Sequence, residues 1–388
     1  MLAPFVICIY LRPWSVREQS ARRRGRDDRQ SGRSPRSRRD SSFWPWRRVI
    51  EGQPRARRRQ WRSRAMTDKK QGAPSSSSTR TRRQVLKEAV GLGAGLAATS
   101  LLGGEASAAP RIRSGTFTTS DGVALNYLEA GRGRPLLLLH GWSQSAALYR
   151  AQILAFSRHH HVFALDWRGH GASEKPEHGY RIARFSRDLH EFICGMRFKH
   201  LSVLGHSMGC GALYSYWDNY GGRDLDRLVL VDVGPAMTAW PDWSAEEAAE
   251  AGALFTPQSL HETAAALRGP DGIATTYGLV ATMFTPGYPA DQLALVVEQN
   301  LKLPRAYAAK LLVDQAEQDW RDVIPRIDVP TLVVGGEASI FNPISQQWVA
   351  DQIPGAELIL FGADEGGSHF MWLENPEKFN EDVLDFLG

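Results

Sequence analysis

The sequence is poor in cysteine. Its 388 residues include 3 cysteines, Cys8, Cys194 and Cys210, and no pair of them has a metal-binding spacing such as Cys-x-x-Cys. We therefore expect no disulfide, and we predict that Cys194 and Cys210 are small buried apolar residues. The tract His159-His160-His161 predicts no metal either, because three adjacent side chains cannot all face one ion. The sequence thus predicts neither a metal nor a cofactor.

The segment after residue 108 lacks an excess of positive charge. The whole chain carries +5 at pH 7, but residues 1–65 hold 19 Arg against 5 acidic residues. Residues 109–388 hold 22 basic and 34 acidic residues, a net charge of −12. A nucleic-acid role inferred from the basic pI of the whole chain would therefore be wrong. We expect no nucleic-acid partner, and the sequence leaves the oligomeric state open.

Residues 1–65 alternate clusters of arginine with serine, glycine and isolated tryptophans. Too little apolar surface is available to offset the entropy of ordering, so a disordered extension is predicted. An RNA- or phospholipid-binding arm is one alternative. Another is that translation begins at Met66 rather than Met1, which we favour because an export signal follows Met66 directly.

Residues 66–108 have the pattern of a cleavable signal peptide. The basic segment 81–87 precedes an apolar run over 89–102, and Ala106-Ser107-Ala108 places small residues before a cleavage point. The pair Arg82-Arg83 resembles the twin-arginine type, which implies the Tat export machinery as a partner. We expect cleavage near Ala108-Ala109 and a periplasmic or extracellular protein. An uncleaved membrane anchor is the alternative, although the apolar run is shorter than the about 20 residues of a stable span.

From residue 109 onward, apolar strand-like runs alternate with helical patterns. A hairpin turn is predicted at Ser120-Asp121-Gly122. Buried strands are predicted at Leu136–Leu139, Val162–Leu165, Leu201–Leu204, Leu228–Val231, Thr331–Val334 and Glu357–Leu360. This alternation predicts an α/β fold, a mostly parallel doubly wound sheet spanning 109–388. Residues from about 236 to 320 are alanine-rich and helix-like, and we interpret them as an inserted helical cap.

The stretch Gly205-His206-Ser207-Met208-Gly209 joins a predicted strand to a predicted helix. This context favours a nucleophile elbow, a tight turn that exposes the Ser207 hydroxyl above the end of the sheet. A serine hydroxyl needs a general base. In this motif the chain order is serine, acid, histidine, which points to His369 in the loop after the last strand.

Two backbone N–H groups are expected to form an oxyanion hole. One belongs to Met208, after the nucleophile, and the other to Trp142, after His140-Gly141. We interpret His140 and His206 as structural residues. We also interpret the loop 166–173, with Asp166 and Arg168, as a brace between neighbouring turns.

These motifs, in this order, resemble the α/β-hydrolase superfamily over roughly residues 115–387. The closest likeness is to serine esterases and the cofactor-free haloperoxidase-like group. The resemblance implies acyl transfer through an acyl-enzyme on a small ester or lactone, with water or peroxide as acceptor. Serine in place of aspartate at 207 argues against haloalkane dehalogenase and epoxide hydrolase activity.

The resemblance also implies two places for the acid. The later one, Gly336-Glu337-Ala338-Ser339, has a serine where the usual aspartate stands. The earlier one offers Asp232, directly after a predicted strand. Asp232 is our first choice and Glu337 our second.

Three alternatives in function remain. A cofactor-free perhydrolase or haloperoxidase-like activity, or a lyase, would use the same Ser-His site, whereas loss of the acid would leave a non-catalytic binding protein. We also expect aromatic residues of the cap and of the loop at 142 to line an apolar acyl pocket, and the candidates are Trp142, Trp240, Trp243 and Phe284.

Overall fold

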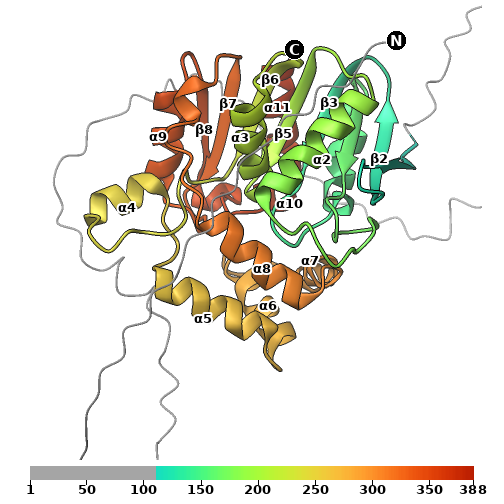
Figure 1. The fold of residues 1–388 in the computed structure, drawn as a ribbon. Helices are drawn as coiled ribbons and strands as arrows, with labels where there is room; N and C mark the ends of the chain where they lie inside the picture. The colour runs from blue at the N-terminus through green and yellow to red at the C-terminus, as the bar shows by residue number, and fades with distance from the viewer. Residues whose placement is uncertain (1–110) are drawn as a thin grey trace, which may run out of the picture. The chain divides into compact units, whose positions relative to one another are not determined.

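The computed structural model describes residues 111–388, so the predicted extension and signal peptide lie outside the described residues. Eight strands form one sheet in the order β1-β2-β4-β3-β5-β6-β7-β8 (Figure 1). The strands are β1 (Arg113–Thr118), β2 (Ala124–Gly131), β3 (Arg134–Leu139), β4 (His160–Leu165), β5 (Leu201–His206), β6 (Leu225–Val231), β7 (Thr331–Gly336) and β8 (Glu357–Phe361). The hairpin β1–β2 and the β2–β4 pair are antiparallel, and the pairs from β4 through β8 are parallel. The predicted α/β fold class is confirmed.

Helices cover both faces of this sheet. The helices that pack on the sheet are α1 (Arg150–Phe156), α2 (Ile182–Gly195), α3 (Met208–Tyr220), α9 (Pro343–Gln352), α10 (Met371–Glu374) and α11 (Pro376–Leu387). In β3, Leu137 and Leu139 face the core on the side of α2 and α3, whereas Leu136 and Leu138 face the core on the side of α1 and α11. Burial on both faces explains why the central strands are continuous apolar runs.

The interval between β6 and β7 is helical, as expected for the segment from about 236 to 320. It contains α4 (Ala245–Ala251), α5 (Pro257–Arg268), α6 (Gly272–Ala281), α7 (Ala290–Leu301) and α8 (Arg305–Ala316). Capping boxes at Ser244 and Thr256 start α4 and α5, and prolines set the starts of α5, α7 and α8. Figure 1 shows α5 to α8 gathered beyond one edge of the strands, apart from α4.

Short 3₁₀ helices complete the fold: η2 (Ala146–Tyr149), which leads into α1, η3 (Ile324–Arg326) and η4 (Ala363–Glu365). Among residues 111–388, no helix combines the length and apolar character needed to span a bilayer.

One prediction about the cysteines is wrong. Cys210 is buried, and its thiol donates to the carbonyl of Gly205 at 3.0 Å. Cys194 is exposed instead, with its sulfur 3.7 Å from Nε2 of His190. It stands near the end of α2 on the solvent side, where the helix does not face the sheet.

Candidate active site

Ser207 occupies a strained turn between β5 and α3. Its backbone has φ 52° and ψ −117°, a positive-φ conformation that non-glycine residues rarely adopt. Its N–H donates to the carbonyl of Val231 on the neighbouring strand at 3.0 Å. A side chain at Gly209 would collide with the carbonyl of Leu139 on β3, so only glycine permits this close passage of helix and strand. The predicted elbow therefore has the geometry of a strained nucleophile turn.

The structure brings His369 and Asp232 together. Asp232 directly follows β6 and is fully buried, and His369 lies in the loop before α10 with 2% exposure. Nδ1 of His369 lies 2.5 Å from Oδ2 of Asp232. Because the carboxylate accepts the Nδ1 proton, Nε2 is left as the basic nitrogen of the neutral ring.

Glu337, the second candidate acid, does not reach this pair. Its side chain is exposed at the end of β7, and its backbone N–H donates to the carbonyl of Phe361 at 2.9 Å. Ser339 lies nearer to the pair. Its hydroxyl donates to Oδ2 of Asp232, the same oxygen that contacts His369. Ser339, which stands after β7 where an aspartate is usual, therefore donates a hydrogen bond to the carboxylate of Asp232, which follows β6.

The loop 140–145, which we call the oxyanion loop, passes beside Ser207. A Cβ at Gly141 would lie 3.1 Å from Cβ of Ser207, so the glycine lets this loop approach the nucleophile. Within residues 111–388, neither the N–H of Trp142 nor that of Met208 has an acceptor. Met208 is the first residue of α3, where free N–H groups and the helix dipole favour negative charge.

Two helices of the inserted segment hold the oxyanion loop. The indole N–H of Trp142 donates to the carbonyl of Ala308 on α8 at 2.8 Å. The hydroxyl of Ser143 donates to the carbonyl of Asn300 on α7 at 2.8 Å, and Nη2 of Arg305 donates to that hydroxyl at 2.8 Å. Burial lowers the pKa of Arg305 to about 10. These hydrogen bonds fix the position of the oxyanion loop relative to the junction between α7 and α8.

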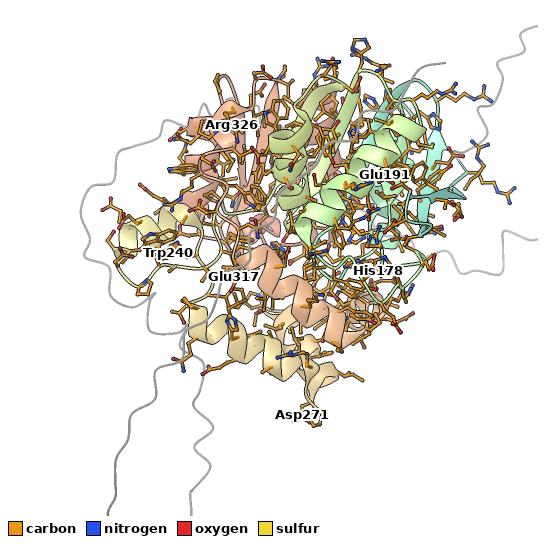
Figure 2. The ribbon with its side chains drawn as sticks, in the orientation of Figure 1. His178, Glu191, Trp240, Asp271, Glu317 and Arg326 are labelled. Atoms are coloured by element: carbon orange, nitrogen blue, oxygen red, sulfur yellow. The ribbon has the colours of Figure 1, made fainter. Side chains whose placement is uncertain are left out.

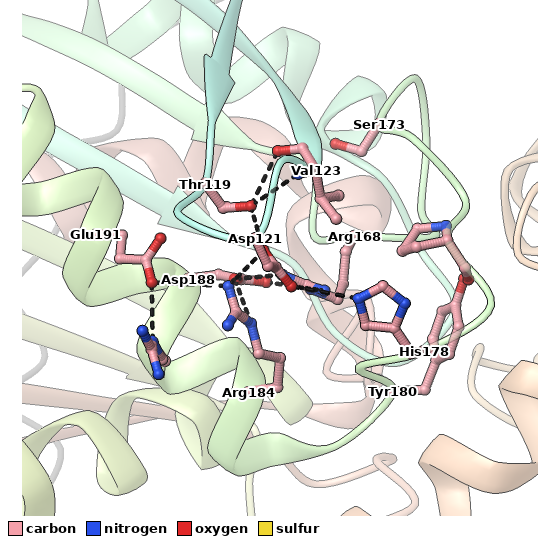
Figure 3. A network of polar contacts seen from close by, with 12 residues as sticks. Thr119, Asp121, Val123, Arg168, Ser173, His178, Tyr180, Arg184, Asp188 and Glu191 are labelled. Carbon is pink, nitrogen blue, oxygen red and sulfur yellow. Dashed lines mark hydrogen bonds and ion pairs between the residues drawn. The ribbon is translucent and has the colours of Figure 1, made fainter.

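A buried ion pair ties the loop 166–173 to α2 and to the β1–β2 turn (Figure 3). Nε of Arg168 lies 2.5 Å from Oδ2 of Asp188 on α2, and Nη1 lies 3.0 Å from Oδ2 of Asp121 in the β1–β2 turn. The hydrogen bond from Arg168 holds the pKa of Asp121 well below its usual range. Next to this arginine, His170 accepts the N–H of Ser143 at 3.2 Å. Arg168 therefore contributes to structure, and no contact places it against Ser207.

Asp166 likewise ties loops together. Its Oδ1 accepts the N–H of Ala146 at 2.7 Å, and its Oδ2 accepts the N–H of Ala172 at 3.0 Å. The carboxylate thus joins the start of η2 to the loop 166–173, which agrees with the interpretation of this loop as a brace.

Three buried histidines surround the site without the geometry of a base. Burial lowers the pKa of His140, and it lowers those of His170 and His206 well below the ordinary value. Nε2 of His206 contacts the carbonyl of His369 at 3.1 Å, so this neutral ring supports the loop that carries His369.

A small, largely apolar cavity opens beside Ser207. Its lining comes from the elbow, the segment after β6 and the end of α8, and includes Met208, Gly211, Met237, Gln315 and Trp320. None of the four aromatic residues predicted for an acyl pocket lines it, so that expectation is wrong.

Each of the four has another place. Trp142 turns its indole to α8, and Trp243 lies under the guanidinium of Arg321, 4.4 Å from the ring centroid. Phe284 stacks on Phe370 at 4.7 Å between centroids. Trp240 is 63% exposed beside α4 (Figure 2). The lining residues Met237 and Trp320 carry no motif, and their role follows only from how the cap folds over the sheet.

Comparison with known proteins agrees with this geometry. The profile of the α/β hydrolase fold family matches residues 134–376. The chain belongs to this family. A non-heme chloroperoxidase of Kitasatospora aureofaciens is 30% identical to this hydrolase over 286 residues, which cover 70% of the chain and 98% of the relative.

Solved structures share the fold of this hydrolase. An esterase from Exiguobacterium antarcticum aligns with a TM-score of 0.63 at 22% identity, covering 70% of this chain and 98% of that one. An enol-lactonase from Burkholderia xenovorans LB400 aligns with a TM-score of 0.61 at 20% identity, covering 70% of this chain and 99% of that one. At these identities the likeness establishes the fold alone.

Proposed function

We propose that this hydrolase cleaves a small carboxylic ester or lactone through an acyl-enzyme intermediate. The observation that carries the proposal is the contact of His369 with the buried carboxylate of Asp232, beside a serine held in a strained turn. In such an arrangement the serine is the nucleophile, the histidine the base and the aspartate its orienting partner.

In the proposed mechanism, Oγ of Ser207 attacks the ester carbonyl carbon while its proton passes to Nε2 of His369. The negative charge on the former carbonyl oxygen is held by the N–H groups of Trp142 and Met208, each worth a few kcal/mol of barrier lowering. When the C–O bond to the leaving group breaks, His369 returns the proton to the departing oxygen. Water then attacks the acyl-serine with His369 again as base, which releases the acid and restores the hydroxyl.

Covalent labelling tests the nucleophile. The full-length chain is incubated with a fluorescent alkylphosphonate and, separately, with p-nitrophenyl acetate. We expect stoichiometric labelling and a burst of p-nitrophenol, both abolished in Ser207→Ala. A chain that neither labels nor turns over short esters would refute the proposal and favour a non-catalytic binding protein. Labelling without hydrolysis would direct attention to lyase chemistry at the same site.

Peroxide is a second acceptor that the 30% identity to a chloroperoxidase favours. Attack of hydrogen peroxide on the acyl-serine would release a peracid and the free hydroxyl, with no metal or cofactor consumed. The assay is peracid formation from acetate and hydrogen peroxide, with Ser207→Ala as control. A halogenation signal that persists in Ser207→Ala would count against this route.

Export through the Tat machinery is also a proposal, since the paired arginines Arg82-Arg83 are followed by an apolar run and small residues. We expect Arg82→Lys combined with Arg83→Lys to retain the chain inside the cell as the uncleaved form. N-terminal sequencing of the exported form is expected to begin near Ala109. Unchanged export of the double variant would contradict this proposal.

A further inference from the structure

The cavity beside Ser207 is placed to receive the acyl part of a substrate. Its lining includes Ser207 and Met208 but does not include His369. In the proposed mechanism, the backbone N–H of Met208 faces the developing oxyanion. The leaving group must take its proton from His369, so that group lies on the histidine side of the serine. The cavity lies on the other side of the serine, where the acyl part of the substrate would extend.

One wall of this mostly apolar cavity is polar. Gln315 on α8 lines it and is only 6% exposed, and its Oε1 is buried with no hydrogen-bond partner in residues 111–388. Nearly all buried polar groups in proteins have a partner, because leaving one unpaired costs free energy. Gln318, which also lines the cavity, differs: its Nε2 donates to the carbonyl of Asp314 at 2.9 Å.

Two further unpaired polar atoms belong to residues that neighbour the lining residues but do not line the cavity themselves. The hydroxyl of Tyr214 is fully buried without a partner among the described residues, and its ring packs 6.1 Å from that of Trp320, which lines the cavity. The hydroxyl of Thr238 is also buried and unpaired within 111–388, and Thr238 directly follows Met237, another lining residue.

We infer that Gln315 determines specificity by accepting a hydrogen bond from a hydroxyl or amide N–H on the acyl chain of the substrate. The substrate class is therefore a short ester or lactone whose acyl part carries a hydrogen-bond donor, rather than a plain alkanoate. This inference rests on the proposed function, since it assigns the cavity through the acyl-enzyme mechanism.

A matched pair of substrates tests it. p-Nitrophenyl 3-hydroxybutanoate and p-nitrophenyl 3-methylbutanoate have the same shape, and a hydroxyl in one replaces a methyl group in the other. With the full-length chain we expect kcat/KM to be about 10- to 100-fold higher for the hydroxy ester, after correction for alkaline hydrolysis rates. Gln315→Met is expected to bring the ratio of the two kcat/KM values close to one. Gln318→Met, the matched control, is expected to change both esters alike and preserve the ratio.

The outcomes separate the two proposals. Turnover of both esters by the wild type without a preference for the hydroxyl overturns the inference and leaves the proposed function standing. Retention of the preference in Gln315→Met, or its loss in Gln318→Met, overturns the assignment to Gln315. If neither ester is hydrolysed, the proposed function fails, and the inference falls with it.

Discussion

Replacing Asp232 with asparagine tests the core of the site. The carboxylate is fully buried, and its Oδ2 lies 2.5 Å from Nδ1 of His369. An amide in its place keeps the shape but removes the negative charge that fixes the ring and stabilises the imidazolium. For a base oriented in this way we expect kcat/KM to fall about 10⁴-fold, which corresponds to about 5.5 kcal/mol of lost transition-state stabilisation.

The assay is initial-rate hydrolysis of p-nitrophenyl acetate, with the rate of phosphonate labelling as a second readout. Glu337→Gln is the matched control, because Glu337 is the alternative acid and its side chain is exposed. We expect this variant to stay within about twofold of the wild type, as a solvated loop charge contributes little. Ser339→Ala removes one hydrogen bond to the carboxylate and should cost about fivefold, near 1 kcal/mol.

A rescue variant sharpens the test. Because the hydroxyl of Ser339 contacts Oδ2 of Asp232, a carboxylate at position 339 lies close to the place where the lost one stood. Adding Ser339→Asp to Asp232→Asn is expected to recover about tenfold or more of the activity, at least 1.4 kcal/mol. The reasoning is refuted if Asp232→Asn retains full activity while Glu337→Gln loses it.

Three further predictions concern stability and positioning. His170 and His206 are buried with pKa values far below normal, so below about pH 6.5 the unfolded state binds more protons than the folded state. Each histidine should therefore lower the free energy of unfolding by about 1.4 kcal/mol for each pH unit that the pH falls below that value. Urea titrations from pH 7.5 to 5.5 should show this slope, and His206→Gln should reduce it. Gly209→Ala should destabilise the fold by about 1–3 kcal/mol or prevent its formation, because the added methyl meets a backbone carbonyl of β3; thermal denaturation measures this, and an unchanged melting temperature would contradict it. Arg305→Lys loosens the oxyanion loop and should lower kcat about tenfold with little change in KM; an effect on KM alone would contradict this.

Strong local patterns made much of the fold predictable. The apolar runs at Leu136–Leu139 and Leu201–Leu204 are typical of strands buried on both faces. The Gly-x-Ser-x-Gly stretch between strand and helix fixes the turn at Ser207, because the glycines are required by close backbone passages. The position of Asp232 directly after a predicted strand favours it over Glu337, and the structure places Asp232, not Glu337, against His369.

The residues that line the cavity could not be predicted from the sequence. Trp320, Met237 and Gln315 come from separate parts of the inserted segment, and only the tertiary folding of that segment brings them together beside Ser207. Trp240 looks equally apolar in the sequence but faces solvent. Cys194 shows the same limit, since it is apolar in character but lies on the solvent side of α2.

The contact between Asp232 and His369 joins positions 137 residues apart in the chain. His369 lies beyond the last strand, so during synthesis the elbow, the oxyanion loop and the acid all leave the ribosome before their histidine does. A nascent or prematurely terminated chain therefore carries the serine without its base. In the proposed mechanism, Ser207 therefore gains its base only after His369 has been synthesised and the C-terminal helices have docked, so the unfinished polypeptide would be inert toward esters.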